Sequence, residues 1–369
     1  MLPYLLVMAL ALVLGAIVCP ERSLKRKKLY LVLIFSAIFL LAACRSVTVG
    51  VDTAMHCKAY RTISLLSYSG MDAITDRFEI GFVLLCKLLS LLNSSYQLLI
   101  VVSSAIICLC AAYFIYSLAD EPVLPTVLYL CLLFPNYLNI MREAIAVAIG
   151  MLAIVALTRQ KKIPFILLVL LASLFHRSAI VLLLLLPLQV VDINWKSLSV
   201  FLIMGLLLFL FAEKFLQVIA TFLGKTSFYD ENFMSSNYFG ALVQFLFELS
   251  LCIVYFNYVC ISHRDGRHLM DSHLELALDW SLLLWLLLSA VGMKVEIVSR
   301  FSYYFAPLIL CALPLSLRVP TEREALLVGY VLLVIAVVYF IVIEALRPEW
   351  HGIVPYVLTG FRFGSFSFV

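Results

Sequence analysis

Apolar segments recur along nearly the whole chain, and each is close to the ~20 residues that a helix needs to cross the hydrocarbon core of a bilayer. Hydrophobic residues make up 64% of the 369 and charged residues only 13%, whereas a soluble globular domain carries roughly a quarter charged residues. A chain of this composition has too few polar residues to cover a water-exposed surface. The sequence therefore predicts an all-α polytopic integral membrane protein and excludes a soluble domain.

The pattern predicts about twelve crossings in a single transmembrane domain over residues 1–369. The expected spans are Leu2–Val18, Leu29–Ala43, Tyr96–Leu118, Val123–Leu138, Ala144–Thr158, Ile163–Phe175, Ala179–Val191, Leu198–Ala220, Phe239–Ile261, Leu274–Val291, Phe301–Leu317 and Ala325–Ala345. The first lacks a basic segment before it, so we interpret it as a retained span rather than a signal peptide. Ile80–Leu92 has only thirteen residues and contains Lys87, so we expect it to lie in the interface or to re-enter.

Basic residues in short loops indicate the orientation, because cytoplasmic loops of membrane proteins are enriched in Lys and Arg. Four basic clusters satisfy one orientation together, and they occupy residues 21–28, 159–162, 263–268 and 318–324. Both termini and the polar segments 44–79 and 222–238 then lie on the outer side. In a membrane protein the formal net charge of +4 reports orientation, so we expect no nucleic-acid partner.

Several outer polar residues have the chemistry of a site. Arg45, Asp52 and Glu79 provide two carboxylates and a guanidinium near one membrane surface, which suits a general base and an anion clamp. The alternative is that outer loops of membrane proteins carry charges anyway. His176, with Arg177, falls between two apolar halves and is expected in a tight turn at the outer surface, as a base or as a donor to phosphate.

Two further arginines lie at the ends of apolar segments. Pro135 is expected to break one helix, and Arg142 and Glu143 open the next. An arginine at a helix N-terminus opposes the helix dipole, so it indicates either a bound anion or an ion pair with Glu143 or another helix. Arg300 starts a later span. Tyr303 and Tyr304 follow it at helical spacing on one face, where interfacial packing is the alternative.

Nothing in the sequence indicates a metal or a cofactor. The ten cysteines lie mostly in apolar runs and form no CxxC or Cys/His spacing. His263, His268 and His273 match no common metal motif. We therefore expect neither a metal site nor a cofactor.

Read in order, these motifs resemble the EpsG family, the Wzy-like polysaccharide polymerases of bacterial envelopes. The residues that carry the resemblance are Arg45, Gly50, Asp52, Thr53, Tyr60, Glu79, Gly81, Phe82, Asn139, Arg142, Ala146, Phe175, His176, Ser178, Ala179, Arg300, Tyr304, Phe305, Pro355 and Tyr356. One position departs from the family pattern, since Glu143 follows Arg142 where the family usually has glutamine.

The resemblance implies a GT-C-like fold with an outward-facing cavity in the bacterial cytoplasmic membrane. Such proteins join oligosaccharide units carried on undecaprenyl pyrophosphate at the outer face, beside a flippase and a chain-length regulator of the same pathway. On this basis Asp52, Glu79 and His176 are the expected catalytic residues. Arg45, Arg142 and Arg300 are expected to bind the pyrophosphate, and the expected glycan contacts are Tyr60, Asn139, Tyr304 and Tyr356.

Two alternatives use the same kinds of residues. One is a GT-C glycosyltransferase or glycan ligase with a polyprenyl-linked donor, and the other is a flippase or transporter of lipid-linked oligosaccharides. A transporter is expected to have polar residues deep within its spans. In this sequence the candidate site residues gather at the outer ends of the spans, which favours the enzyme.

Overall fold

The computed structural model describes residues 1–19, 23–66, 77–222, 238–266 and 271–359. Helices dominate this part of the chain, and it contains no β-strand beyond one isolated bridge between Arg45 and Leu358. The helices are α1 (Leu2–Val18), α2 (Leu24–Ala43), α3 (Thr53–Leu65), α5 (Ile80–Leu92), α6 (Gln97–Leu118), α7 (Val123–Leu128), η2 (Tyr129–Leu133), α8 (Phe134–Asn139), α9 (Met141–Thr158), α10 (Lys162–Ser173), η3 (Arg177–Leu184), α11 (Leu185–Leu188), α12 (Trp195–Phe222), α13 (Tyr238–Arg264), α14 (Ser272–Gly292), α15 (Glu296–Ser302), η6 (Ala306–Leu308), α16 (Ile309–Ser316), α17 (Glu322–Leu346) and α18 (Pro348–His351).

Six described helices are long and apolar enough to cross a membrane by length and composition, or seven if one bent pair counts as a single span. The six candidate spans are Gln97–Leu118, Met141–Thr158, Trp195–Lys214, Phe239–Arg264, Ser272–Gly292 and Glu322–Leu346. Five shorter apolar helices accompany them, among them Leu2–Val18 and Lys162–Ser173. The chain is thus an all-helical multi-pass membrane protein, while the count of about twelve crossings stays a prediction. Most of the expected outer loop at 222–238, residues 223–237, lies outside the described residues.

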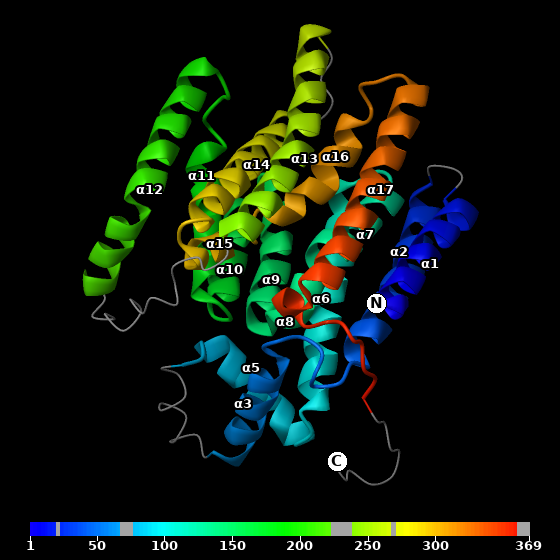
Figure 1. Cartoon of the computed structure of the whole chain (residues 1–369), viewed down its shortest axis with the longest axis vertical. Helices are drawn as coiled ribbons and strands as arrows, with labels where there is room; N and C mark the ends of the chain where they lie inside the picture. Colours follow the sequence, from blue (N-terminus) through cyan, green and yellow to red (C-terminus); the bar gives the residue numbers. More distant parts are fainter. Residues whose placement is uncertain (20–22, 67–76, 223–237, 267–270, 360–369) are drawn as a thin grey trace.

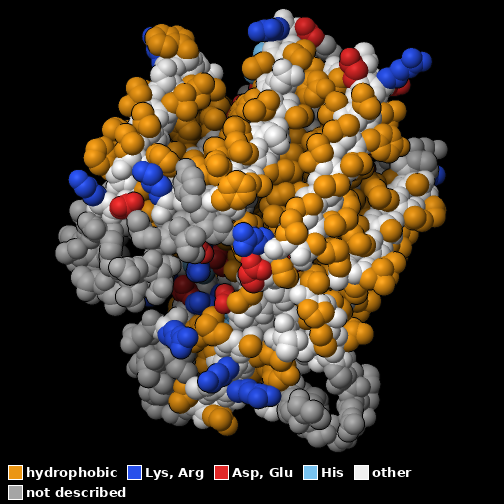
Figure 2. Space-filling model, in the orientation of Figure 1, with side chains coloured by type: hydrophobic (Ala, Val, Ile, Leu, Met, Phe, Trp, Pro, Cys, Tyr) orange, Lys and Arg blue, Asp and Glu red, His pale blue; other side chains and the backbone are white. Residues whose placement is uncertain are grey.

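The helices form a long bundle with a small lobe below it (Figure 1). Hydrophobic side chains cover most of the bundle in the view of Figure 2, and charged side chains gather at its upper ends. Acidic and basic side chains also lie in a hollow where the bundle meets the lobe. This distribution is the one expected of a body that packs against lipid.

The lobe consists of α3 and α5, which pack on the N-terminal part of α6 around a separate apolar core (Figure 1). Tyr60 and Phe82 are fully buried in this core. The ammonium group of Lys87 donates to the carbonyl oxygen of Leu66 at 2.5 Å, just beyond the end of α3, where a cation also complements the helix dipole. This contact explains why a lysine lies in an otherwise apolar helix.

Pro135 follows an interruption of the regular α-helix without ending the span. The chain runs from Val123 to Asn139 through a five-residue π-helical turn, η2, and Pro135 lies at the start of α8 directly after it. A wider π turn shifts the backbone hydrogen bonds, so the missing N–H of a proline is tolerated there. The span ends at Ile140, directly before α9.

The predicted span from Phe301 is broken near its start. Helix α15 ends at Ser302, and η6 begins at Ala306, with a bend of 43° between the two helical pieces. Arg300, Tyr303 and Tyr304 therefore do not share one face of a continuous helix, as the spacing predicted. The bend directs the two tyrosines to different neighbours, which are described below.

Candidate active site

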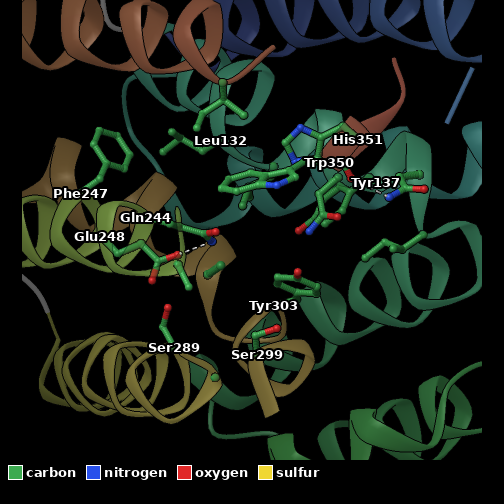
Figure 3. A pocket seen from close by; sticks show the side chains of 18 of the residues that line it. Leu132, Tyr137, Gln244, Phe247, Glu248, Ser289, Ser299, Tyr303, Trp350 and His351 are labelled. Carbon is green, nitrogen blue, oxygen red and sulfur yellow. Dashed lines mark hydrogen bonds between the residues drawn. The ribbon is translucent and has the colours of Figure 1, made fainter. Parts of the chain in front are cut away.

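A cavity of about 650 Å³ opens among α8, α13, α14, α15, α17 and α18. Its lining mixes aromatic and apolar side chains with amides, carboxylates and one arginine. Figure 3 shows side chains from these different helices pointing into the same space. Of the residues proposed from the sequence, the cavity brings together Asp52, Asn139 and Arg300.

Asp52 is held at the cavity edge by backbone contacts. Its N–H donates to Asn139 Oδ1 at 3.0 Å, and Asn139 Nδ2 in turn donates to the carbonyl oxygen of Trp350 at 3.3 Å. No hydrogen bond joins the Asp52 carboxylate to a described side chain. Both carboxylate oxygens are therefore available to a ligand.

Gly50 allows the C-terminal segment to approach this loop. Its N–H donates to the carbonyl oxygen of Gly352 at 2.8 Å, and its φ of +92° is a conformation that favours glycine. A Cβ at this position would lie 2.5 Å from the carbonyl oxygen of Leu138. Glycine at position 50 thus permits the backbone hydrogen bond that connects the Asp52 loop with the segment that carries Trp350.

Arg142 lies in the first turn of α9 and contacts two other elements. Its Nη1 forms an ion pair with Glu79, the residue before α5, and its Nε donates to His56 Nε2 at 3.1 Å. The guanidinium also lies over the Phe78 ring, 4.8 Å from its centroid. Of the alternatives open in the sequence, the structure thus shows a pair with another element and not with Glu143.

His56 is neutral in this arrangement. Because its Nε2 accepts from Arg142, the proton lies on Nδ1, which is 2.8 Å from the Asp52 carbonyl oxygen. Burial, followed by the positive charge of Arg142, lowers the pKa of His56 from 6.5 to about 3.

We expect acid to destabilise the protein through His56. The unfolded chain binds a proton near pH 6.5 and the folded chain near pH 3, so the stabilisation is complete above 6.5 and is lost as the pH falls below it. At pH 5 the loss is about 2 kcal/mol. Thermal unfolding of the detergent-solubilised protein between pH 7.5 and 5 measures it. His56→Gln should remove about 2 kcal/mol of the loss at pH 5 and leave the share of His176, whose pKa is also lowered. Thr62→Gln, at an exposed position of the same helix, should keep the wild-type profile. A wild-type profile in His56→Gln would contradict the assignment.

Glu143 and His176 form a second group beside the first. Glu143 is 3% exposed, its Oε1 has no partner among the described residues, and its Oε2 lies 3.8 Å from His176 Nε2. His176 Nδ1 lies 2.6 Å from Ser178 Oγ, which donates to the Tyr304 hydroxyl at 3.0 Å. Burial lowers the pKa of His176 to about 4, and Arg142 and Arg300 add to the effect against an opposing contribution from Glu79.

Arg300 differs from the other arginines because it is exposed to the cavity and makes no hydrogen bond or ion pair with a described residue. It lies on α15 next to Tyr303, which also lines the cavity. Helix α15 packs against η3, which carries Ser178 of the second group. In the described lining it is the cation available to an anionic ligand.

Seven of the ten predicted site residues do not line the cavity. Glu79, Arg142, His176 and Tyr304 belong to the two groups described above, and the other three bond to groups near helix ends. Arg45 is 2% exposed and donates to the Ala42 carbonyl at 2.7 Å and to Ser104 Oγ at 3.1 Å. The Tyr60 hydroxyl donates to the Asn93 carbonyl at 2.5 Å, and the Tyr356 hydroxyl to the Leu41 carbonyl at 2.7 Å. These side chains bond to backbone groups near helix ends. Their contacts with the substrate stay a prediction.

The cavity also includes residues that sequence reasoning did not single out. They are Gln244, Glu248, Glu344, Trp350 and His351. Glu248 lies inside the candidate span α13 and Glu344 near the end of α17. A carboxylate within an apolar span is an available signal of function, and applying it would have found both. Polar side chains therefore also extend into the bundle, beyond the outer ends where the sequence placed the candidate site residues.

The fold and the site together define a class: a multi-pass helical membrane protein with a charged cavity assembled from distant parts of the chain. A profile described as the EpsG family matches residues 28–358, nearly the whole chain. The chain belongs to the EpsG family and is thus a polysaccharide polymerase-like membrane protein. No curated protein and no solved structure gives a significant match.

Proposed function

We propose that this protein is an enzyme that polymerises oligosaccharide units linked to undecaprenyl pyrophosphate into exopolysaccharide, capsule or O-antigen. One observation carries the proposal. The Asp52 carboxylate and the Arg300 guanidinium line the same cavity, and neither pairs with a described residue. A glycosyl transfer that releases a pyrophosphate needs an acceptor for a proton and a cation for the leaving group.

In the proposed reaction the acceptor hydroxyl attacks the anomeric carbon of the donor sugar and gives its proton to Asp52. The bond from that carbon to the pyrophosphate oxygen breaks, and the electron pair leaves with the pyrophosphate. Arg300 stabilises the charge that develops on this oxygen, an interaction stronger in the transition state than in the ground state. Glu79 and His176 are the substitute bases, but Glu79 is paired with Arg142.

We further propose a GT-C-like arrangement of about twelve crossings in the bacterial cytoplasmic membrane, with the α3–α5 lobe and the cavity on the outer side. The short apolar helices cross in this arrangement, except α5, which lies in the interface with the rest of its lobe. The apolar surface of the bundle (Figure 2) suits the polyprenyl chain of the substrate. A flippase would supply that substrate, and a chain-length regulator would act on the product.

Deletion of the gene tests the function. We expect the deletion strain to make glycan as single repeat units or not at all, while lipid-linked precursors still form. Mass spectrometry of extracted precursors and gel analysis of surface glycan measure both, with the wild-type gene restored on a plasmid as control. Normal chain lengths with loss of one side-branch sugar would instead support the glycosyltransferase alternative.

Thiol labelling tests the orientation. In a background without native cysteines, cysteine at the exposed positions Ala54 and Arg177 should react with a membrane-impermeant reagent in intact spheroplasts. Cysteine at Lys161 and Asp265, also exposed, should react only after permeabilisation, because the basic loops lie in the cytoplasm. The reverse pattern would place the cavity on the cytoplasmic side and refute the proposed reaction site.

A further inference from the structure

We propose, resting on the polymerase function above, that the wall of the cavity formed by α13, α14 and α17 is a subsite for one sugar ring that carries no negative charge. Glu248 accepts hydrogen bonds from its hydroxyl groups, and Trp350 contacts its flat face. Glu248 and Trp350 have no role in the polymerase reaction proposed above, in which Asp52 and Arg300 act.

Glu248 has one carboxylate oxygen that is available to accept a hydrogen bond from a ligand. The residue is 5% exposed, and Gln244 Nε2 donates to its Oε1 at 3.0 Å. Its Oε2 has no partner among the described residues, although both residues line the cavity. Leaving a buried acceptor unpaired costs about 1–3 kcal/mol, and more for a charged group. Figure 3 shows Gln244, Glu248 and Ser289 around one part of the cavity, with the dashed bond between the first two.

A second buried carboxylate repeats this arrangement. Glu344 is 1% exposed, its Oε1 lies 2.5 Å from His351 Nδ1, and its Oε2 has no partner among the described residues. Tyr339 lines the same cavity as Glu248 and Glu344. The Tyr339 ring also stacks on Phe247, with centroids 4.0 Å apart and planes inclined by 6°. Helices α13 and α17 therefore present two acceptor oxygens to the same cavity.

An aromatic side chain lies opposite these acceptors. Figure 3 shows the Trp350 indole inside the cavity, between His351 and the Glu248 group. Its backbone carbonyl is held by Asn139 Nδ2, which orients the segment. A pocket with an aromatic face and a few polar groups suits a sugar, because a sugar ring presents C–H groups on its faces and hydroxyl donors at its edge.

The charge of the lining excludes acidic sugars. The described lining has five carboxylates, one arginine and one histidine, His351, which contacts Glu344; the carboxylates are Asp52, Glu248, Glu296, Glu344 and Glu349. A uronic acid beside Glu248 and Glu344 would place like charges together in a partly desolvated site. No group of three or more metal-ligating side chains occurs among the described residues to hold a bridging cation. Neutral sugars and amino sugars therefore fit this wall, and the anionic part of the substrate belongs near Arg300.

A binding experiment tests the subsite without relying on catalysis. Tryptophan emission of the full-length protein in nanodiscs is titrated with methyl glucoside, methyl N-acetylglucosaminide and methyl glucuronide at one ionic strength. We expect at least one of the two neutral glycosides to change the emission, and the glucuronide to need about tenfold higher concentration. Glu248→Gln should weaken the neutral glycoside about tenfold and reduce this discrimination. Asp279→Asn is the matched control, because Asp279 is also a buried carboxylate, on α14, but bonds to Tyr255 outside the cavity.

Trp350→Phe provides a second variant if Glu248→Gln does not fold, and it should reduce the emission change and weaken binding, while Trp285 on α14, which also lines the cavity, still reports the sugar. Equal binding of glucuronide and neutral glycosides to the wild type overturns the proposal, and so does the absence of any emission change. Unchanged titrations in the Glu248→Gln and Trp350→Phe proteins overturn it as well. A selective sugar site in a protein whose deletion leaves normal polymer would refute the polymerase function alone. Loss of polymer without sugar selectivity would refute the subsite alone.

Discussion

Arg300→Ala is expected to reduce polymer formation about 100-fold while the protein remains in the membrane. Losing one preorganised contact to a developing negative charge costs roughly 3 kcal/mol, which is about two orders of magnitude in rate. The structure makes this variant informative because Arg300 makes no hydrogen bond or ion pair with a described residue, so its removal leaves no described partner unpaired. Glycan chain length and turnover of lipid-linked precursor, normalised to the amount of protein in the membrane, measure the effect.

Two further variants separate charge from position. Arg300→Lys keeps the charge but loses the planar fork that grips two phosphate oxygens, so it should recover only part of the activity. Arg177→Ala removes another exposed arginine, one that does not line the cavity, and should polymerise like the wild type. Wild-type rates in Arg300→Ala would refute the leaving-group role of this residue.

Arg142→Ala should also lower polymerisation by about two orders of magnitude, with a loss of stability that Arg300→Ala does not show. The guanidinium pairs with Glu79 and donates to His56, and both side chains of the ion pair are largely buried, at 17% and 14% exposed. Removing one partner of such a pair leaves an uncompensated charge, which costs about 3 kcal/mol when the pair is buried. Arg142→Lys should restore little of the polymerisation or the stability, because one ammonium group cannot reach two partners that lie in different directions.

A double variant decides between a catalytic and a structural Arg142. Arg142→Gln combined with Glu79→Gln removes both charges, so the thermal stability should recover relative to Arg142→Gln alone. If Arg142 exchanges Glu79 for the pyrophosphate during the reaction, polymer formation stays low in the double variant. Recovery of polymer together with stability would show that Arg142 acts only as the ion-pair partner of Glu79.

The helical class follows from the sequence alone, because backbone groups in hydrocarbon must bond within their own segment and ~20 apolar residues are needed to cross. Local signals also predicted Ile80–Leu92 with its observed bounds and separated it from the longer helices. The order of the family motifs was readable as well, and the family match confirms it over residues 28–358.

Local signals failed where backbone geometry depends on neighbouring helices. A proline predicts a helix break from its missing N–H, but the π turn before Pro135 lets the span continue. The break after Ser302 likewise separated Tyr303 from Tyr304, which spacing had placed on one face. The break has a signal in Pro307 at the start of η6, because a proline cannot donate to the carbonyl four residues before it.

Only the tertiary structure decided which polar residues line the cavity. Arg45 and Arg300 look alike in the sequence, since both are arginines at the outer end of an apolar segment. Arg45 is buried between the Ala42 carbonyl and the Ser104 hydroxyl of the distant helix α6, whereas Arg300 faces a cavity that distant helices enclose. The same holds for Glu248 and Glu344, which α13 and α17 bring to one cavity. Residue type determines what a side chain is able to bind, but the packing of distant helices determines which partner it meets.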